Sequence, residues 1–447
     1  MKTRHFLNSA LAASLIFAAP QAGADDLQTI YQLALTNDPL FQAARSDFLA
    51  NKELKSQAWA VLLPQISGSY LKSETEVNTS NNVMNPVGTT EVSGYSLSLT
   101  QTIYNQAQFS GLSQANATVA RAVADFHFQE QNLILRVAKN YFDVLGAEDN
   151  LAFSQAEKKS IAHQLEQTTQ RFNVGLTAIT DVHEAQARYD QSVARDIAAE
   201  NQLAISREIL REMTGKEHGN LAVLQESSPL IAPQPADITQ WVNTGLDNNY
   251  QLAAARKNLE ASSAGVMKAR AGHLPSLNLV AGMNNTTREG PIAYETDDTQ
   301  ISLQLSVPIF NGGLVSSRST EAAHRHDQAK QLLEQQRRAT ERQVRNAYLS
   351  VLAKISQVKA LKQALASSQT ALKATRAGFK VGTRTTVDVL DSQRDLYRAK
   401  RDYALARYEY IMETLRLKQA AGTLTPEDLQ HINAWLSMTR PAVSETP

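Results

Sequence analysis

The sequence predicts a mostly α-helical protein that also carries membrane β-strands. Its unit, which occurs twice, is a helix, a β-hairpin, a very long helix and a returning helix. Three observations lead to this fold class. Two stretches far apart in the chain carry the same residues at the same spacing, which indicates an internal repeat. Each half has short runs in which apolar and polar residues alternate, which is the period of a strand. Each half also has apolar residues that recur every seven positions, over a length that exceeds an ordinary globular helix.

The repeat is clearest around two expected helix–helix turns. Residues 171–189 read RFNVGLTAITDVHEAQARY, and residues 378–396 read GFKVGTRTTVDVLDSQRDL. Identical residues are matched at a constant offset, because 379 − 172 = 388 − 181 = 207. A gapless match over such a span indicates a duplicated structural unit.

The first residues have the pattern of a secretory signal. Basic residues near the start are followed by an apolar run at 11–19 and by the small residues AGA at 22–24. We therefore expect residues 1–24 to be a cleavable signal peptide and the mature chain to begin at Asp25. The apolar run is too short to span a bilayer as a helix, and no later stretch is long and apolar enough.

Composition argues against several classes of protein. The chain of 447 residues has no cysteine, which excludes disulfides, thiol catalysis and cysteine metal sites. Its 44 Lys and Arg residues balance 44 Asp and Glu residues, so bulk electrostatic binding to nucleic acid is not indicated. The sequence also lacks a Gly-rich phosphate loop and the HExxH and GxSxG motifs, and we expect neither enzyme activity nor a cofactor.

The first repeat is expected to span residues 25–215. Its helical patterns cover 26–62, 106 to about 172, and 180–213. The first of these is briefly interrupted near Asp38-Pro39, and the last stops at Gly215. Two alternating runs predict strands at about 65–78 and 92–104, separated by a polar loop over 78–91. The long helix would reach roughly 100 Å at 1.5 Å per residue.

The second repeat is expected over 237–422, after an irregular, proline-rich linker at 216–236. Its helical patterns cover 238–271, a long helix ending at Phe379, and a returning helix ending at Gly422. Strands are expected at about 275–287 and 299–309, with a polar loop over 284–298. The long helix carries an unbroken heptad series: Val344, Val351, Val358, Leu365, Leu372 and Phe379. A short segment and a polar tail, 423–447, complete the chain.

Two hairpins provide four strands, and this number bears on assembly. Four strands with one apolar face cannot close a membrane barrel, for which eight is the usual minimum. Strands left open in lipid would have unsatisfied edges. Several chains sharing one barrel would solve the problem, which indicates a homo-oligomer without fixing its number.

The sequence, over nearly the whole mature chain, resembles the TolC family of outer-membrane efflux and secretion channels. The most specific stretches are VGTRTTVDVLD at 381–391 and FNVGLTAITDV at 172–182. The resemblance implies that three chains share a twelve-stranded outer-membrane barrel, which continues as a long periplasmic α-helical barrel. The segments at 216–236 and after 423 would form a belt around its middle.

The resemblance also implies roles for residues of the two tips. Asp388 and Asp391 would form acidic rings that select cations. Arg384 would bond an acidic residue, Asp181 or Asp388, on a neighbouring helix or protomer. Thr180 and Phe379 would supply a further restraint, although the family aromatic is often a tyrosine and Phe379 lacks its hydroxyl. The turn residues of the tips would dock the adaptor: Gly175, Gly382, Val174 and Val381.

Each of these residues also has a purely structural interpretation. Thr385 followed by Asp388 fits a capping box, and an acid in the first helical turn suits the macrodipole. Gly175 and Gly382 are most simply turn residues with positive φ. His324 and His326 lie about 200° apart on a helix, so we expect no metal site there.

The leading functional hypothesis is an outer-membrane exit duct that passively conducts drugs or polypeptides. Its expected partners are two further copies of the chain, a periplasmic adaptor protein and an inner-membrane pump of the ABC or RND type. The rival is a periplasmic coiled-coil adaptor or scaffold, which would explain the long helices but not the duplicated strands. The sequence does not name the cargo or the pump, because drug efflux and type I secretion use the same kind of duct.

Overall fold

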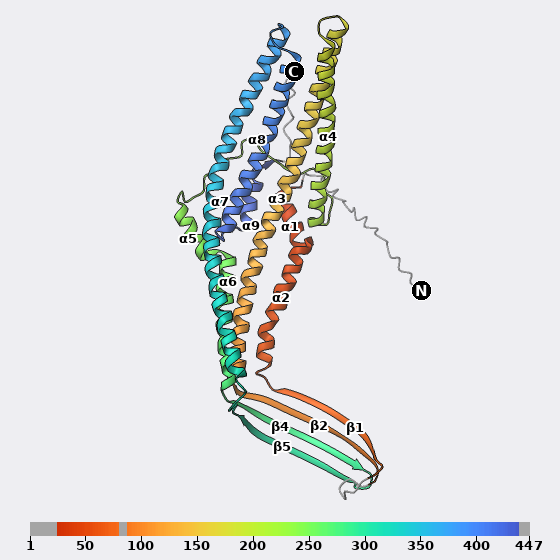
Figure 1. Cartoon of the computed structure of the whole chain (residues 1–447), viewed down its shortest axis with the longest axis vertical. Helices are drawn as coiled ribbons and strands as arrows, with labels where there is room; N and C mark the ends of the chain where they lie inside the picture. Colours follow the sequence, from red (N-terminus) through yellow and green to blue (C-terminus); the bar gives the residue numbers. More distant parts are fainter. Residues whose placement is uncertain (1–24, 80–86, 438–447) are drawn as a thin grey trace, which may run out of the picture.

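Long helices run along most of the molecule, and a β-sheet lies at one end of them (Figure 1). The structure is a computed structural model, and it describes residues 25–79 and 87–437. The expected signal peptide at 1–24 and the last ten residues of the tail lie outside the described residues.

The two halves of the chain repeat one order of elements. The first half consists of α1 (Leu27–Asn37), α2 (Pro39–Ala60), β1 (Gln65–Val77), β2 (Gly88–Asn105), α3 (Gln106–Asn173) and α4 (Ile179–Thr214). The second half consists of α5 (Ile238–Asn248), α6 (Tyr250–Arg270), the 3-10 turn η1 (Ala271–His273), β4 (Ser276–Glu289), β5 (Tyr294–Ser306), α7 (Leu314–Lys380) and α8 (Thr386–Ala420). The described structure therefore has the duplicated unit that the sequence predicts.

Both halves begin with a broken helix, and only the first break was expected. Asp38 caps α2 by accepting a hydrogen bond from the Phe41 N–H at 3.1 Å, and Pro39 occupies the first helical turn. The helix expected over 238–271 is likewise two helices and a 3-10 turn. Asn249 ends α5 and caps α6 by accepting from the Leu252 N–H at 3.0 Å. No proline marks this break, and the sequence interpretation did not use the polar run Asp247, Asn248 and Asn249 as a signal for it.

The hairpin boundaries differ from the expected ones. The polar loop expected over 284–298 is mostly strand, and only residues 290–293 connect β4 to β5. Polar side chains there pair across the hairpin, as in the 2.7 Å bond from Asn285 Nδ2 to Asp297 Oδ1. β5 ends at Ser306 and not near 309, because Pro308 has no N–H for a strand ladder.

The four strands form one antiparallel sheet in the order β1-β2-β4-β5. The register aligns apolar residues across it, from Ile66 to Leu99, Ala281 and Ile301. The other face is polar, and Ser67 and Ser98 are hydrogen bonded through their hydroxyls at 2.7 Å. The apolar face is open in the single chain, where Ile301 is 76% exposed and Ile66 67% exposed.

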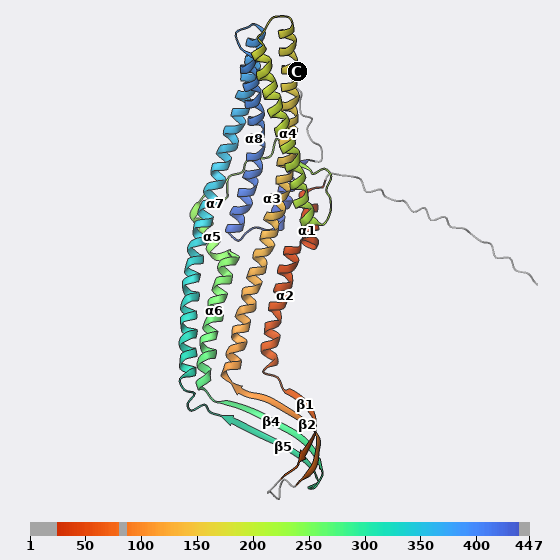
Figure 2. The same cartoon turned by 45° about the vertical axis from the view of Figure 1, so that its right-hand side comes forward.

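The long helices pack in pairs above the sheet. α3 pairs with α4 and α7 with α8 toward the end remote from the sheet, whereas α2 and α6 lie beside α3 nearer the sheet (Figure 2). The heptad residues predicted from the sequence lie at the contacts between these helices. Of these residues, Val137, Val344 and Val351 are completely buried. Within residues 25–79 and 87–437, no helix combines the length and apolar character needed to cross a membrane.

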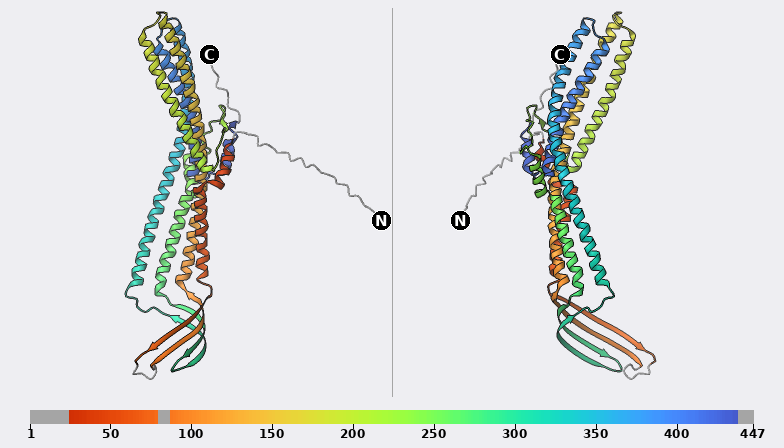
Figure 3. Two further views of the ribbon diagram at one scale, coloured as in Figure 1. Left: turned by 90° about the vertical axis from the view of Figure 1, so that its right-hand side faces the viewer. Right: turned by 60° about the vertical axis from the view of Figure 1, so that its left-hand side comes forward.

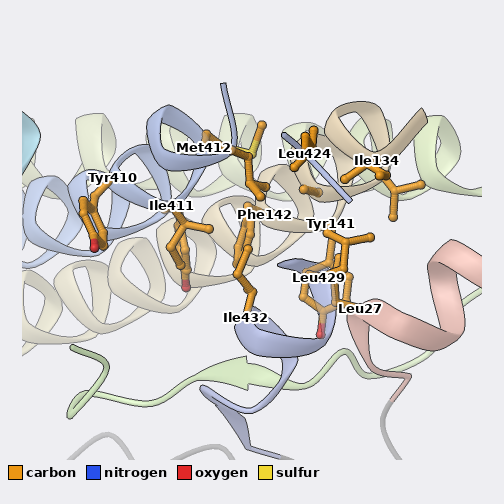
Figure 4. Packing of buried hydrophobic residues seen from close by; sticks show 14 of the residues in the cluster. Leu27, Ile134, Tyr141, Phe142, Tyr410, Ile411, Met412, Leu424, Leu429 and Ile432 are labelled. Carbon is orange, nitrogen blue, oxygen red and sulfur yellow. The ribbon is translucent and has the colours of Figure 1, made fainter. Parts of the chain in front are cut away.

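A hydrophobic core forms where short elements lie against the middle of the long helices (Figure 3). These elements are α1, α9 (Pro426–Asn433) and the two-stranded pair β3 (Val223–Leu224) and β6 (Leu436–Ser437). Leu27, Tyr141 and Leu429 are fully buried in this core (Figure 4). The Tyr141 hydroxyl donates to the Ala222 carbonyl at 2.6 Å, which fixes the linker to α3.

Candidate functional site: the paired helical tips

The two helical hairpins, α3–α4 and α7–α8, end in tips at the end remote from the sheet (Figure 1). Both tips turn by the same Schellman motif. Gly175 has φ +76° and Gly382 has φ +79°. The N–H of Leu176 donates to the Arg171 carbonyl at 2.8 Å, and the N–H of Thr383 to that of Gly378 at 2.9 Å. These atoms are related by the 207-residue offset, so the duplicated sequence produces a duplicated turn.

Asp388 lies in the capping box at the start of α8. Its Oδ2 accepts from the Thr385 N–H at 2.9 Å, and the Thr385 hydroxyl accepts from the Asp388 N–H at 3.2 Å. The bond from the Thr385 backbone, followed by that from its side chain, holds the pKa of Asp388 below its usual value. The carboxylate is half exposed, so capping leaves it charged and accessible.

Asp391, one turn further along α8, joins two helices. Its Oδ1 lies 3.2 Å from Arg188 Nη2 on α4 and 3.2 Å from Arg394 Nη1 on α8. The sequence interpretation missed both arginines. No local pattern indicates Arg188 as a partner, because 203 residues separate it from Asp391.

Arg384 lies near one of its two expected acidic partners, Asp388, and the other, Asp181, is bound by a different side chain. Arg384 Nη1 lies 4.0 Å from Asp388 Oδ1, and its side chain is 60% exposed. Asp181 instead accepts a hydrogen bond from the Thr177 hydroxyl. Thr180 is exposed at the start of α4. Contacts of Arg384 or Thr180 with a neighbouring protomer stay an expectation.

Phe379 connects the two tips without a hydroxyl. The Arg171 guanidinium lies over its ring, 4.8 Å from the centroid. Arg171 lies in the last turn of α3 and Phe379 in the last turn of α7, so a cation–π contact joins the first tip to the second. The sequence interpretation considered only the missing hydroxyl and overlooked this contact.

Each tip exposes apolar side chains at its turn. In the first tip Val174 is 70% exposed and Leu176 67% exposed, and in the second tip Val381 is 76% exposed. Apolar side chains presented together on a turn are typical of a surface that another protein covers. For metal binding, no group of three or more suitable side chains occurs within the described ranges.

Comparison with known proteins accounts for this arrangement. The family model described as outer membrane efflux protein matches residues 30–216 and 241–423. These two matches coincide with the two structural repeats. Together they cover most of the chain.

Relatives match over nearly their full length. The outer membrane protein TolC of Vibrio cholerae is 37% identical, over 96% of this chain and 98% of that protein. TolC of Escherichia coli K12 is 36% identical, over 93% and 85%. The alkaline protease secretion protein AprF of Pseudomonas aeruginosa is 30% identical, over 97% and 92%.

Solved structures share the fold at lower sequence identity. CusC has a TM-score of 0.78 at 18% identity, over 94% of this chain and 99% of that chain. The outer membrane protein VceC of Vibrio cholerae has a TM-score of 0.75 at 18% identity, over 89% and 96%. The duplicated helical hairpins, the single sheet formed by both β-hairpins and the paired tips agree with these comparisons. The chain belongs to the outer membrane efflux protein family.

Proposed function

We propose that three copies of this chain form an outer-membrane exit duct of a tripartite efflux or type I secretion system. The observation that carries the proposal is the four-stranded sheet with an open apolar face and two free edges, β1 and β5. An apolar face of this kind is suited to lipid, and its edges require strands of other chains. Three sheets of four strands would make a barrel of twelve, above the minimum of eight.

The polar face of the sheet would then line the barrel. Serine pairs on adjacent strands, such as Ser67 with Ser98 and Ser69 with Ser96, cover that face with hydroxyls. The paired long helices would continue the wall on the periplasmic side, and their tips would surround the entrance. Repeated around an axis, Asp388 and Asp391 would concentrate negative potential and favour cations.

We further propose that the entrance is held closed by contacts between the tips. Arg171 over Phe379 and Arg188 with Asp391 each join the first hairpin to the second. Exposed contacts of this kind are individually weak. Binding of a partner at the apolar turns could therefore separate them.

The partners in this proposal are a periplasmic adaptor and an inner-membrane pump, with export through a signal peptide at 1–24. Relatives include a protease secretion protein and a pyoverdine export protein of Pseudomonas aeruginosa. Their names differ in cargo, which supports a passive duct whose cargo is set by the pump. The chain itself would perform no chemistry. Family membership decides against the rival hypothesis of an adaptor or scaffold.

Cross-linking of the free edges tests the trimeric barrel. The chain has no cysteine, so single cysteines can be placed cleanly. Ser69→Cys on β1 would be combined in turn with Asp298→Cys, Gln300→Cys and Ser302→Cys on β5. At the correct register, oxidation of membrane-extracted protein should give covalent dimers and trimers but nothing larger.

The single-cysteine variants provide the control, since one edge alone should not cross-link. Only monomers at every pairing, or a ladder beyond three chains, would contradict a closed trimer.

A further inference from the structure

An arginine-lined cavity lies between α3, α4 and α8, and of the tip residues described above only Arg394 lines it. Its volume is ≈ 320 Å³, at the lower end of the range of small-ligand sites. The charged side chains of its lining are four arginines and one glutamate: Arg195, Arg394, Arg398, Arg401 and Glu157. Four positive charges and one negative charge leave the lining with an excess of three positive charges.

The arginines of α8 form one stripe. Arg394, Arg398 and Arg401 follow the i, i+4, i+7 spacing that places residues on one helix face. Like charges at this spacing destabilise a helix unless something neutralises them. Each of the three lines the same cavity, which is partly open to solvent.

Partners within the chain neutralise this stripe incompletely. Arg394 pairs with Asp391 and Asp395, and Arg401 with Asp402 at 3.5 Å. These carboxylates are substantially exposed, and exposed pairs of this kind are weak. Within the described part of the chain, Arg398 forms no ion pair.

The opposite wall of the cavity, formed by α3 and α4, carries ordered polar side chains. Glu157 is buried and accepts from Arg195 Nη2 at 2.8 Å, which holds that guanidinium at the cavity. Beside it on α3, the hydroxyl oxygen of Ser154 is buried and has no hydrogen-bond partner. A buried hydroxyl without a partner carries a desolvation cost that a ligand acceptor would remove.

We propose that this cavity binds a small multivalent oxyanion, such as phosphate or sulfate. The planar fork of a guanidinium matches two oxygens of such an anion. The anion would receive hydrogen bonds from the α8 arginines on one side and from the Ser154 hydroxyl on the other. It would thereby hold α8 against the α3–α4 hairpin. This proposal concerns binding only and does not depend on the proposed export function.

Calorimetric titration of the purified full chain in neutral detergent tests the site. Inorganic phosphate and sulfate should bind saturably, whereas chloride at equal ionic strength should not. Arg398→Gln should weaken phosphate binding by about tenfold or more, because it removes charged hydrogen bonds. Ser154→Ala should weaken binding less and provides a second variant if the first does not fold.

Arg416→Gln is the matched control. Arg416 lies on the same helix and pairs with Glu413, but it does not line the cavity. Its phosphate affinity should equal that of the unsubstituted protein. Equal heats for chloride and phosphate, or unchanged phosphate affinity in both Arg398→Gln and Ser154→Ala, would overturn the proposal.

Discussion

Two aspartates one helical turn apart at the α8 tip have different surroundings. Asp388 is held by the first turn of its own helix, through Thr385. Asp391 is held by arginines of two helices, Arg188 and Arg394. Asp388 therefore carries the less compensated charge, and its titration is the more direct measure of an acidic entrance.

The depressed pKa of Asp388 predicts the pH dependence of that charge. A carboxyl group whose folded-state pKa lies below its ordinary value of 3.8 stays ionised to lower pH. Its contribution to capping is fully present above the unfolded-state value of about 3.9 and is lost as pH falls through the folded-state pKa. In an Asp391→Asn background, cation selectivity should persist from about pH 7 to about pH 4 and decline only below.

Reversal potentials across a planar bilayer measure this selectivity. The double variant Asp388→Asn, Asp391→Asn should show no such transition. A decline centred near neutral pH in the Asp391→Asn background would show that another group controls the selectivity.

A glycine of the α7–α8 tip offers a second prediction at the residue scale. Gly382 has φ +79°, and an added Cβ would meet nothing within 4 Å. Gly382→Ala should therefore cost about 1–2 kcal/mol through backbone strain alone. Amide exchange over residues 378–390 should become faster.

Gly219→Ala is the matched control, because its Cβ also meets nothing within 4 Å and its backbone does not have positive φ. Exchange that is equally unchanged in both variants would contradict the strain at the tip.

Local residue patterns were predictable, and distant contacts were not. The capping box of Thr385 and Asp388 and the turn at Gly382 follow from spacing within a few residues. Arg188 and Arg171 lie about two hundred residues from the side chains they contact. Only the packing of one hairpin against the other brings them together, and a single sequence does not specify that register.

At the scale of the elements, the cation–π contact of Arg171 with Phe379 links α3 to α7. An exposed contact of this kind contributes about 0.5–1 kcal/mol. Phe379→Leu should therefore raise the open probability of the entrance by roughly two- to fivefold. Single-channel recording measures this change.

Phe379→Tyr is the matched variant because it keeps the aromatic ring. It should leave the open probability at or below that of the unsubstituted protein. An equal rise in both variants would exclude the ring as the source of the restraint.

The order of strands and helices was predictable because the spacing of apolar residues changes within each half. It is two residues in the strands and seven in the long helix. The break at Asn249 and the extra strand residues at the start of β5 were not predictable. Both depend on polar side chains whose role is settled by neighbours. Asn249 becomes a cap by accepting from the Leu252 N–H, and Asp297 extends β5 by accepting from the Asn285 side chain.

For the whole molecule, the two faces of the sheet should respond differently to charge. Ile301 lies on the apolar face, and Gln300 beside it on the polar face. A lysine facing lipid costs about 2–4 kcal/mol at the bilayer midplane. Ile301→Lys should therefore reduce the amount of assembled protein in the outer membrane, whereas Gln300→Lys should not.

Fractionation followed by electrophoresis of unheated samples measures the assembled oligomer. Loss of assembly in Gln300→Lys alone would reverse the assignment of faces, and equal loss in both variants would contradict the predicted difference between them. The alternation of apolar residues predicted these faces, but the number of chains in the barrel came only from family resemblance.

The most direct test of the duct with a gated entrance is single-channel conductance of the purified protein, alongside the double variant Asp388→Asn, Asp391→Asn. The unsubstituted protein should give small, cation-selective currents that multivalent cations block from the tip side. Block should be lost in the double variant and kept in Glu321→Gln, which alters an exposed acid on α7 far from the tip. No current from a folded, membrane-inserted oligomer would contradict the duct, and undiminished block in the double variant would contradict an acidic entrance at the tips.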